Sequence, residues 1–177
     1  MKRLVMVALV LVSAMACDDE SPTTPSDSNT RRFTAVLLPQ NEVPAVTNAD
    51  AGASGTMQLT MTVTRDSSNA ITGATYDFVV NMTGFPAPTT LTGAHIHPGA
   101  AGAIGGVVVP LALTGTDTAV TTGQATITKP GQGVTNPALN PATVAQGIWD
   151  NPGGHYFNVH TTLNGGGAIR GQLVRVD

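Results

Sequence analysis

In residues 55–63, GTMQLTMTV, polar and apolar side chains alternate strictly from Thr56 onward. The apolar positions are Met57, Leu59, Met61 and Val63, and the residues between them are threonine or glutamine. Successive side chains of a β-strand point to opposite faces, so this stretch predicts a strand with one buried face and one face in water. A helix would instead place its apolar residues three or four positions apart.

The same alternation recurs in other parts of the chain. It is clear again at Tyr76, Phe78, Val80 and Met82. We expect further strands at residues 33–38, 91–97, 107–113, 124–128, 155–161 and 168–176. Many short strands separated by glycine, proline and asparagine are typical of an antiparallel sheet protein. The predicted fold class is therefore all-β, an antiparallel β-sandwich or barrel with Greek-key-like connections.

One segment breaks the strand pattern. Asn140 is a good helix N-cap, Pro141 suits the first helical position, and the NPGG at 151–154 ends the segment. We expect one short helix here. Trp149, the only tryptophan, is expected to fill the core at that end, with stacking on a ligand as the alternative.

Composition limits the size and the partners of the protein. The chain has 177 residues and 41% hydrophobic content, which is enough for one domain with a real core. Only 11% of the residues are charged, and the formal net charge is −3. Because no basic surface is available to neutralise phosphates, we expect no nucleic-acid partner.

The N-terminal segment has the pattern of a secretion signal. Residues 1–16 begin with Lys2 and Arg3, continue with an apolar run over 4–12, and end in small residues. The apolar run is shorter than the roughly 20 residues that a membrane-spanning helix needs. We therefore expect an exported protein from which residues 1–16 are removed as a signal peptide.

Cys17 stands directly after that segment and is the only cysteine of the chain. The preceding residues are similar to the lipobox of bacterial lipoproteins, which predicts a lipid on Cys17 and a membrane-anchored lipoprotein of the cell envelope, on its periplasmic or surface face. Ordinary cleavage at the same bond, leaving a free thiol, is the alternative. Residues 18–32 are polar and rich in proline and serine, so we expect 17–32 to form a flexible tether before a domain at 33–177.

Three histidines form the candidate binding site. His95 and His97 belong to GAHIHPG, residues 93–99, and His160 belongs to YFNVHT, residues 156–161. Residues two apart in a strand share a face, so His95 and His97 are expected to point together, away from the core. If the two strands are neighbours, His160 joins them, and three imidazoles are a common ligand set for zinc or copper.

The same histidines have other interpretations. They can form a polar cluster that holds the neighbouring glycine-rich loop by hydrogen bonds, or they can bind a ligand without a metal. The sequence supports no reaction. The few serines of residues 33–177 lie at predicted turns, this segment has no cysteine, and its acidic residues are scattered.

Three motifs in order carry a family resemblance. They are FTAVLLPQNEVPAV near the start, GAHIHPGAAGAIGGVVVPL in the middle and HYFNVHTTLNGGGAIRGQL at the end. Together they resemble the CHRD domain, named from chordin, over about residues 33–174. The resemblance implies a secreted β-rich binding or structural module with no established reaction. Its signature positions here are Glu42, Pro44, His95, His97, Asn158, His160, Thr161, Ile169, Arg170 and Gly171. The chain departs from the family at Ala168, where an acidic residue is usual.

Arg170 also raises a question of charge. We expect it on the side of its strand opposite Ile169, and a guanidinium group is seldom buried without a carboxylate partner. Glu42 is the expected partner, in a structural clamp between the two ends of the domain.

Two functions follow from these observations. The first is a non-enzymatic, envelope-anchored CHRD-like module that binds a protein or polysaccharide of the envelope or matrix. The alternative is a mononuclear copper or zinc domain that uses His95, His97 and His160, with redox chemistry like that of superoxide dismutase as one form of it. The chain has four histidines, too few for the six of a two-metal dismutase centre.

Overall fold

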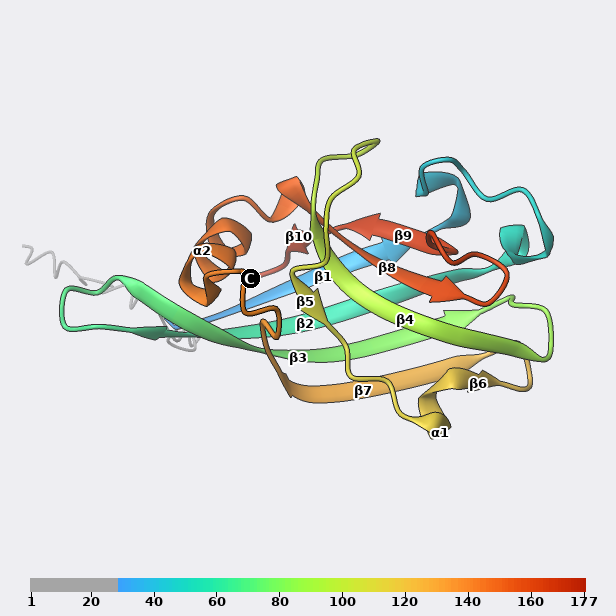
Figure 1. Cartoon of the computed structure of the whole chain (residues 1–177), viewed down its shortest axis with the longest axis horizontal. Coiled ribbons are helices and arrows are strands. Elements are labelled where there is room, and N and C mark those ends of the chain that lie inside the picture. Colours follow the sequence, from blue (N-terminus) through green and yellow to red (C-terminus); the bar gives the residue numbers. More distant parts are fainter. Residues whose placement is uncertain (1–28) are drawn as a thin grey trace, which may run out of the picture.

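The alternating stretch at residues 55–63 lies in strand β2, Ser54–Arg65, at the centre of one of two β-sheets (Figure 1). The computed structural model describes residues 29–177. Met57, Leu59 and Met61 are almost completely buried, whereas Gln58 is exposed. The predicted two-faced strand is therefore confirmed.

The first sheet has the strand order β10-β1-β2-β3-β7, and its pairings are antiparallel. Besides β2, its strands are β1 (Thr30–Leu37), β3 (Ile71–Thr83), β7 (Ala125–Gln132) and β10 (Val174–Arg175). The second sheet has the order β5-β4-β8-β9, and a short strand, β6, pairs with the start of β4. Its strands are β4 (Thr89–Pro98), β5 (Val109–Pro110), β6 (Ala119–Val120), β8 (His155–Thr161) and β9 (Ile169–Gln172).

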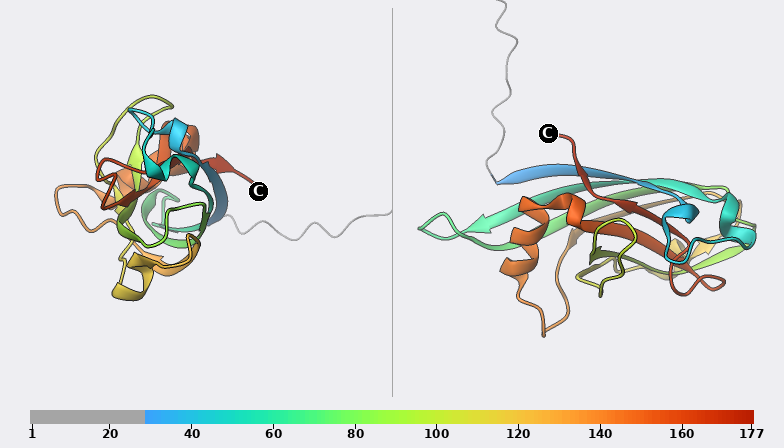
Figure 2. Two further views of the ribbon diagram at one scale, coloured as in Figure 1. Left: turned by 90° about the vertical axis from the view of Figure 1, so that its right-hand side faces the viewer. Right: turned by 90° about the horizontal axis from the view of Figure 1, so that it is seen from above.

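The two sheets pack face to face around one apolar core (Figure 2). The predicted all-β fold class is therefore confirmed, and of the two architectures expected, sandwich or barrel, the structure has the sandwich. Phe78 of one sheet and Phe157 of the other meet in this core, with ring centroids 5.8 Å apart. At one edge the sheets also meet through a β-bridge between Leu38 and Arg170. Gly171 lies beside this bridge, where a Cβ would collide with the carbonyl oxygen of Val36.

The predicted helix is α2, Pro141–Asp150, at one end of the sandwich. The side chain of Asn140 caps it by accepting hydrogen bonds from the backbone N–H groups of Ala142 and Thr143. Trp149 is 7% exposed and packs in the core, in agreement with the expected core position. A four-residue helix, α1 (Gly115–Thr118), and three short 3-10 helices, η1 (Pro39–Asn41), η2 (Ala49–Gly52) and η3 (Pro152–Gly154), were not predicted.

Two of the predicted strands were clearly too long. The segment 107–113 contributes only the two residues of β5, although Val108 and Leu111 on either side of it still donate hydrogen bonds to carbonyl oxygens of β4. The segment 168–176 is interrupted at Leu173, whose side chain is buried and whose N–H bonds to the carbonyl oxygen of His155. After this residue the chain leaves β8 and pairs with β1 of the other sheet.

The sheet begins earlier than the predicted domain boundary at residue 33. Residues 30–32 already pair with residues 60–62 of β2, so they belong to the fold and not to the tether. The predicted signal peptide and Cys17 lie outside the described residues. Among residues 29–177, no helix combines the length and the apolar character needed to cross a bilayer.

Candidate metal centre

The histidine motifs lie on two neighbouring strands, as the metal hypothesis requires. β4 pairs with β8 in a register that places His95 opposite Asn158, and His160 opposite Gly93. Ile96 of β4 and Val159 of β8 belong to the core. The histidines alternate with these residues, so their imidazoles stand on the outer face of the second sheet.

The structure brings the three predicted imidazoles together. The ring centroids are 4.9 Å apart for His95 and His160, 5.6 Å for His95 and His97, and 6.3 Å for His97 and His160. One nitrogen of each ring lies within 4.8 Å of the other two. The fourth histidine, His155, lies outside this cluster, and its Nδ1 atom is 3.0 Å from the carbonyl oxygen of Asn151.

Two of the rings are held in the same manner. Nδ1 of His97 lies 3.0 Å from the carbonyl oxygen of Gly105, and Nδ1 of His160 lies 3.0 Å from that of Gly165. A carbonyl oxygen only accepts hydrogen bonds, so each Nδ1 carries the proton. In the neutral ring the other nitrogen, Nε2, then keeps its lone pair. Both Nε2 atoms lie 3.0 Å from Oδ1 of Asn158.

His95 completes the cluster with an unsatisfied nitrogen. Its Nδ1 atom is buried and has no hydrogen-bond partner among the residues that the structure describes. Such atoms are rare in folded proteins and call for a ligand or another explanation. The ring lies over Gly93, where an added Cβ would come within 2.7 Å of Cε1 of His95. A glycine at position 93 therefore gives this ring its place on the sheet.

Burial keeps the three imidazoles in their neutral form. Desolvation lowers the pKa of His95 to about 4, and repulsion by His160 and His97 adds to this effect. Desolvation also lowers the pKa of His97 and of His160, although their hydrogen bonds to loop carbonyls act in the opposite direction. Neutral imidazole is the form that binds a metal, so protons compete weakly for this cluster near pH 7.

Tyr156 and Arg170 support the cluster from the side. The ring of Tyr156 stacks on His97 with centroids 4.8 Å apart, and the guanidinium carbon of Arg170 lies 3.3 Å from the centre of the Tyr156 ring. Arg170 also donates hydrogen bonds to the carbonyl oxygens of Ala100 and Ala103. It thereby fixes residues 99–106, the loop that carries Gly105.

The expected clamp between Glu42 and Arg170 is wrong as a direct ion pair. Both side chains are buried, but the described residues show no contact of 4 Å or less between their charged atoms. The guanidinium group of Arg170 instead lies over the Tyr156 ring and donates hydrogen bonds to carbonyl oxygens of the loop 99–106. Oε1 of Glu42 lies 3.5 Å from Nδ2 of Asn158. Burial raises the pKa of Glu42 to about 7, although the charge of Arg170 and the hydrogen bond from Asn158 oppose the rise.

The model of one protein family matches this chain. It is the CHRD domain, and the match covers residues 33–173. The chain belongs to the CHRD family. The comparisons with curated proteins and with solved structures give no match.

Two residues of β9 have defined structural roles in this CHRD domain. Arg170 covers Tyr156, and Gly171 allows β9 to approach β1 closely. Ala168, which precedes Ile169, is fully buried, and its N–H bonds to the carbonyl oxygen of Val159. This position therefore brings no carboxylate to the cluster.

One supporting residue was missed in the sequence. Asp50 is 1% exposed, and its Oδ2 atom accepts hydrogen bonds from Oγ1 of Thr161 at 2.7 Å and from Nδ2 of Asn164 at 2.5 Å. These bonds hold the loop 162–167, whose Gly165 fixes His160. The partners of Asp50 are more than a hundred positions away in the chain, and no local pattern marks them.

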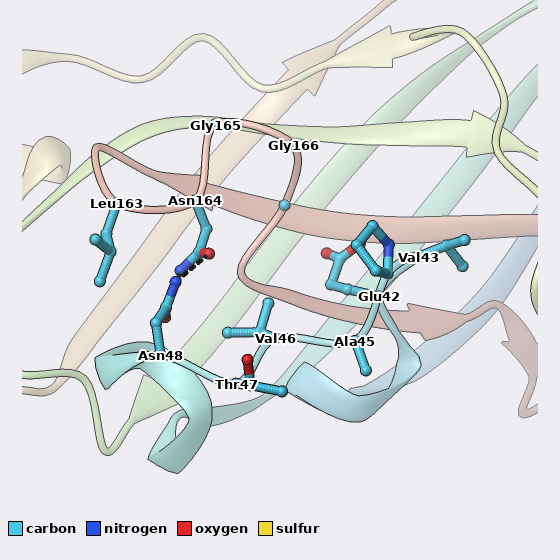
Figure 3. A pocket seen from close by; sticks show the side chains of 12 residues that line it. Glu42, Val43, Ala45, Val46, Thr47, Asn48, Leu163, Asn164, Gly165 and Gly166 are labelled. Carbon is cyan, nitrogen blue, oxygen red and sulfur yellow. Dashed lines mark hydrogen bonds between the residues drawn. The ribbon is translucent and has the colours of Figure 1, made fainter.

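A hollow of about 380 Å³ is lined by residues that include Glu42 and Gly165 (Figure 3). It lies between the loop 42–48, which contains Pro44, and the loop 163–167. The side chains of Asn48 and Asn164 bond to each other across it. Glu42 and Gly165 border both the hollow and the network around the cluster.

Proposed function

We propose that this CHRD domain is a metal-binding module, in which His95, His97 and His160 hold one copper or zinc ion. The observation that carries the proposal is the convergence of three imidazole nitrogens within 4.8 Å of one another on one face of a rigid sheet. Three histidines of this kind suit both metals.

The hydrogen bonds of the rings favour this function over a purely structural cluster. Metal-bound histidines commonly donate their other N–H to a backbone carbonyl, which fixes the tautomer and the direction of the ring. His97 and His160 both have this arrangement, with Gly105 and Gly165 as acceptors. A cluster that served only to hold loops would have no need to leave Nδ1 of His95 buried and unpaired.

The proposal is limited to a single ion. The fourth histidine, His155, is engaged with α2 and η3 and takes no part in the cluster. A two-metal centre of the dismutase kind is therefore not proposed.

Metal content tests this function directly. The purified protein is stripped with a chelator, dialysed against micromolar Zn(II) or Cu(II), and analysed for bound metal. We expect one ion per chain, lost in His95→Ala and in His160→Ala but retained in His155→Ala, the matched control. No uptake by the unmodified protein, or equal uptake by all three variants, would contradict the proposal and leave a structural polar cluster.

We further propose that the module is exported and anchored to the cell envelope through a lipid on Cys17, with its loops directed to an envelope or matrix protein or polysaccharide. Exposed apolar side chains on the two loops at the cluster support a partner, since Ile104 is 73% exposed and Leu163 55% exposed. Mass spectrometry of the mature N-terminal peptide tests the anchor, and an unmodified Cys17 would refute it. Capture of envelope proteins and polysaccharides, compared with an Ile104→Ser and Leu163→Ser double variant, tests the loops.

A further inference from the structure

We infer that Asn158 supplies the fourth ligand of the metal, through its side-chain oxygen Oδ1. The inference rests on the proposed function, because it requires an ion at the three histidines. Asn158 belongs to β8 and stands opposite His95 in the pairing with β4. It is 2% exposed, so its amide is turned toward protein groups and not toward solvent.

The arrangement of acceptors around this oxygen points to a cation. The Nε2 atoms of His97 and His160 each lie 3.0 Å from Oδ1 of Asn158. Because both rings carry their proton on Nδ1, neither Nε2 atom can donate to this oxygen while the ring is neutral. The lone pairs of Oδ1 of Asn158 and of the two Nε2 atoms therefore face one another in buried surroundings. A metal ion among them converts this repulsion into three bonds.

The distances suit a shared ion. In a tetrahedral zinc site with bonds of about 2.0–2.1 Å, neighbouring ligand atoms lie about 3.3 Å apart. The two contacts of 3.0 Å between Oδ1 of Asn158 and the imidazole nitrogens are close to this separation. The imidazole nitrogens lie within 4.8 Å of one another, so they must move closer by up to about 1.5 Å to bind one ion.

Glu42 acts here as a positioning residue. Nδ2 of Asn158 points to Oε1 of Glu42 at 3.5 Å, which leaves Oδ1 directed at the histidines. A carboxylate only accepts hydrogen bonds, so Glu42 selects this orientation of the amide in its ionised form, above its pKa of about 7. The alternative orientation would let Nδ2 donate to the two Nε2 atoms, and Asn158 would then hold the rings without binding the metal.

The number of protein ligands decides whether a zinc site is of the structural or the catalytic kind. Catalytic zinc sites keep one coordination position for water or substrate, whereas structural sites fill all four positions with protein atoms. With Asn158 bound, the site holds its ion and offers no open position. The ion then serves to join β4, β8 and the two loops, which accords with a binding or structural module.

Co(II) provides the first test, because its visible spectrum reports its coordination. The full chain is loaded with Co(II), and azide is added as a probe for an open position. We expect a four-coordinate spectrum that azide does not change. A spectrum that shifts with azide shows an exchangeable position and overturns the inference, while the metal-binding proposal itself stands. If the chain takes up no Co(II), Zn(II) or Cu(II) at all, both fail.

Two variants make the test specific to Asn158. Asn158→Leu removes the oxygen and keeps the same branching and number of heavy atoms. We expect Co(II) affinity to fall about tenfold or more and the spectrum to become sensitive to azide. The double variant Glu42→Gln/Asn158→Asp exchanges amide and carboxylate, so an oxygen still faces the histidines. We expect it to bind Co(II) within about tenfold of the unmodified affinity and to resist azide. An Asn158→Leu protein that matches the unmodified protein in affinity and spectrum overturns the inference. If Asn158→Leu does not fold, the double variant decides, and azide sensitivity there overturns it.

Discussion

The guanidinium carbon of Arg170 lies 3.3 Å from the centre of the Tyr156 ring, and Tyr156 in turn stacks on His97. The same guanidinium group donates hydrogen bonds to the carbonyl oxygens of Ala100 and Ala103. One buried cation thus links β9, β8 and the loop that fixes a histidine of the cluster. The guanidinium group is planar, so it can stack on the Tyr156 ring and donate hydrogen bonds to the loop carbonyls at the same time.

We therefore expect Arg170→Lys to lower the free energy of unfolding by about 2–4 kcal/mol. An ammonium group keeps the charge but can neither stack on Tyr156 nor reach both carbonyls in the same way. Urea denaturation measures the effect. Arg175→Lys is the matched control, since Arg175 is partly exposed and pairs with Asp177 near the C-terminus, and it should change stability by less than about 0.5 kcal/mol. Equal stability of the two variants would show that Arg170 has no such role.

The metal-free protein should lose stability in acid through His95. The pKa of the His95 imidazole is lowered to about 4 in the folded protein and is about 6.5 in the unfolded chain, so between these values the unfolded chain binds more protons. The contribution of His95 is complete above pH 6.5 and is lost as the pH falls toward 4. At pH 5 we expect a loss of about 1–2 kcal/mol relative to pH 7.5, measured by urea denaturation in a chelator. His95→Gln should show a correspondingly smaller loss, and an unchanged pH profile in that variant would refute the assignment.

Glu42 should have the opposite effect on the pH dependence of stability, so that the free energy of unfolding falls as the pH rises. Its pKa is raised from 4.5 to about 7, so in this range the folded protein binds more protons and stability falls as the pH rises. In Glu42→Gln this decline should be smaller by about 2 kcal/mol between pH 4.5 and pH 8, again in metal-free protein. The neutral amide has no charge to lose in the buried site. A decline as steep as in the unmodified protein would mean that Glu42 is already ionised throughout.

The start of β1 should be essential to the domain. Residues 30–32 pair with β2, Arg31 donates a hydrogen bond to the carbonyl oxygen of Trp149, and its guanidinium carbon lies 3.9 Å from the centre of the Trp149 ring. A protein that begins at Phe33 should be less stable than one that begins at Asn29 by about 2–3 kcal/mol. Thermal and urea denaturation of the two proteins compare them directly. If they are equally stable, residues 29–32 belong to the tether after all.

The sequence predicts the site better than its surroundings, for a physical reason. The positions of His95 and His97 follow from the two-residue period of a strand, and the apolar Ile96 between them settles which side is buried. The partner of Arg170 does not follow from any period. It depends on the path of the loop 99–106, whose carbonyl groups compete successfully with the carboxylate of Glu42.

The same distinction applies to the strands. β2 and β8 were predicted closely because their alternation is regular and uninterrupted. The predicted strand at 168–176 was too long, because the sequence does not reveal that the chain changes sheets at Leu173. Asp50 was missed because its partners Thr161 and Asn164 come from the other end of the domain.

The central claim is that three neutral imidazoles, two of them with tautomers set by loop carbonyls, hold one metal ion. Long-range ¹H–¹⁵N NMR spectra of the histidine rings during a Zn(II) titration test it most directly. We expect Nδ1–H tautomers for His97 and His160 in the metal-free protein, and a shift of their Nε2 resonances that is complete at one equivalent of Zn(II), with His155 unchanged. Nε2–H tautomers in the metal-free protein, or ring resonances that do not respond to Zn(II), would contradict the account.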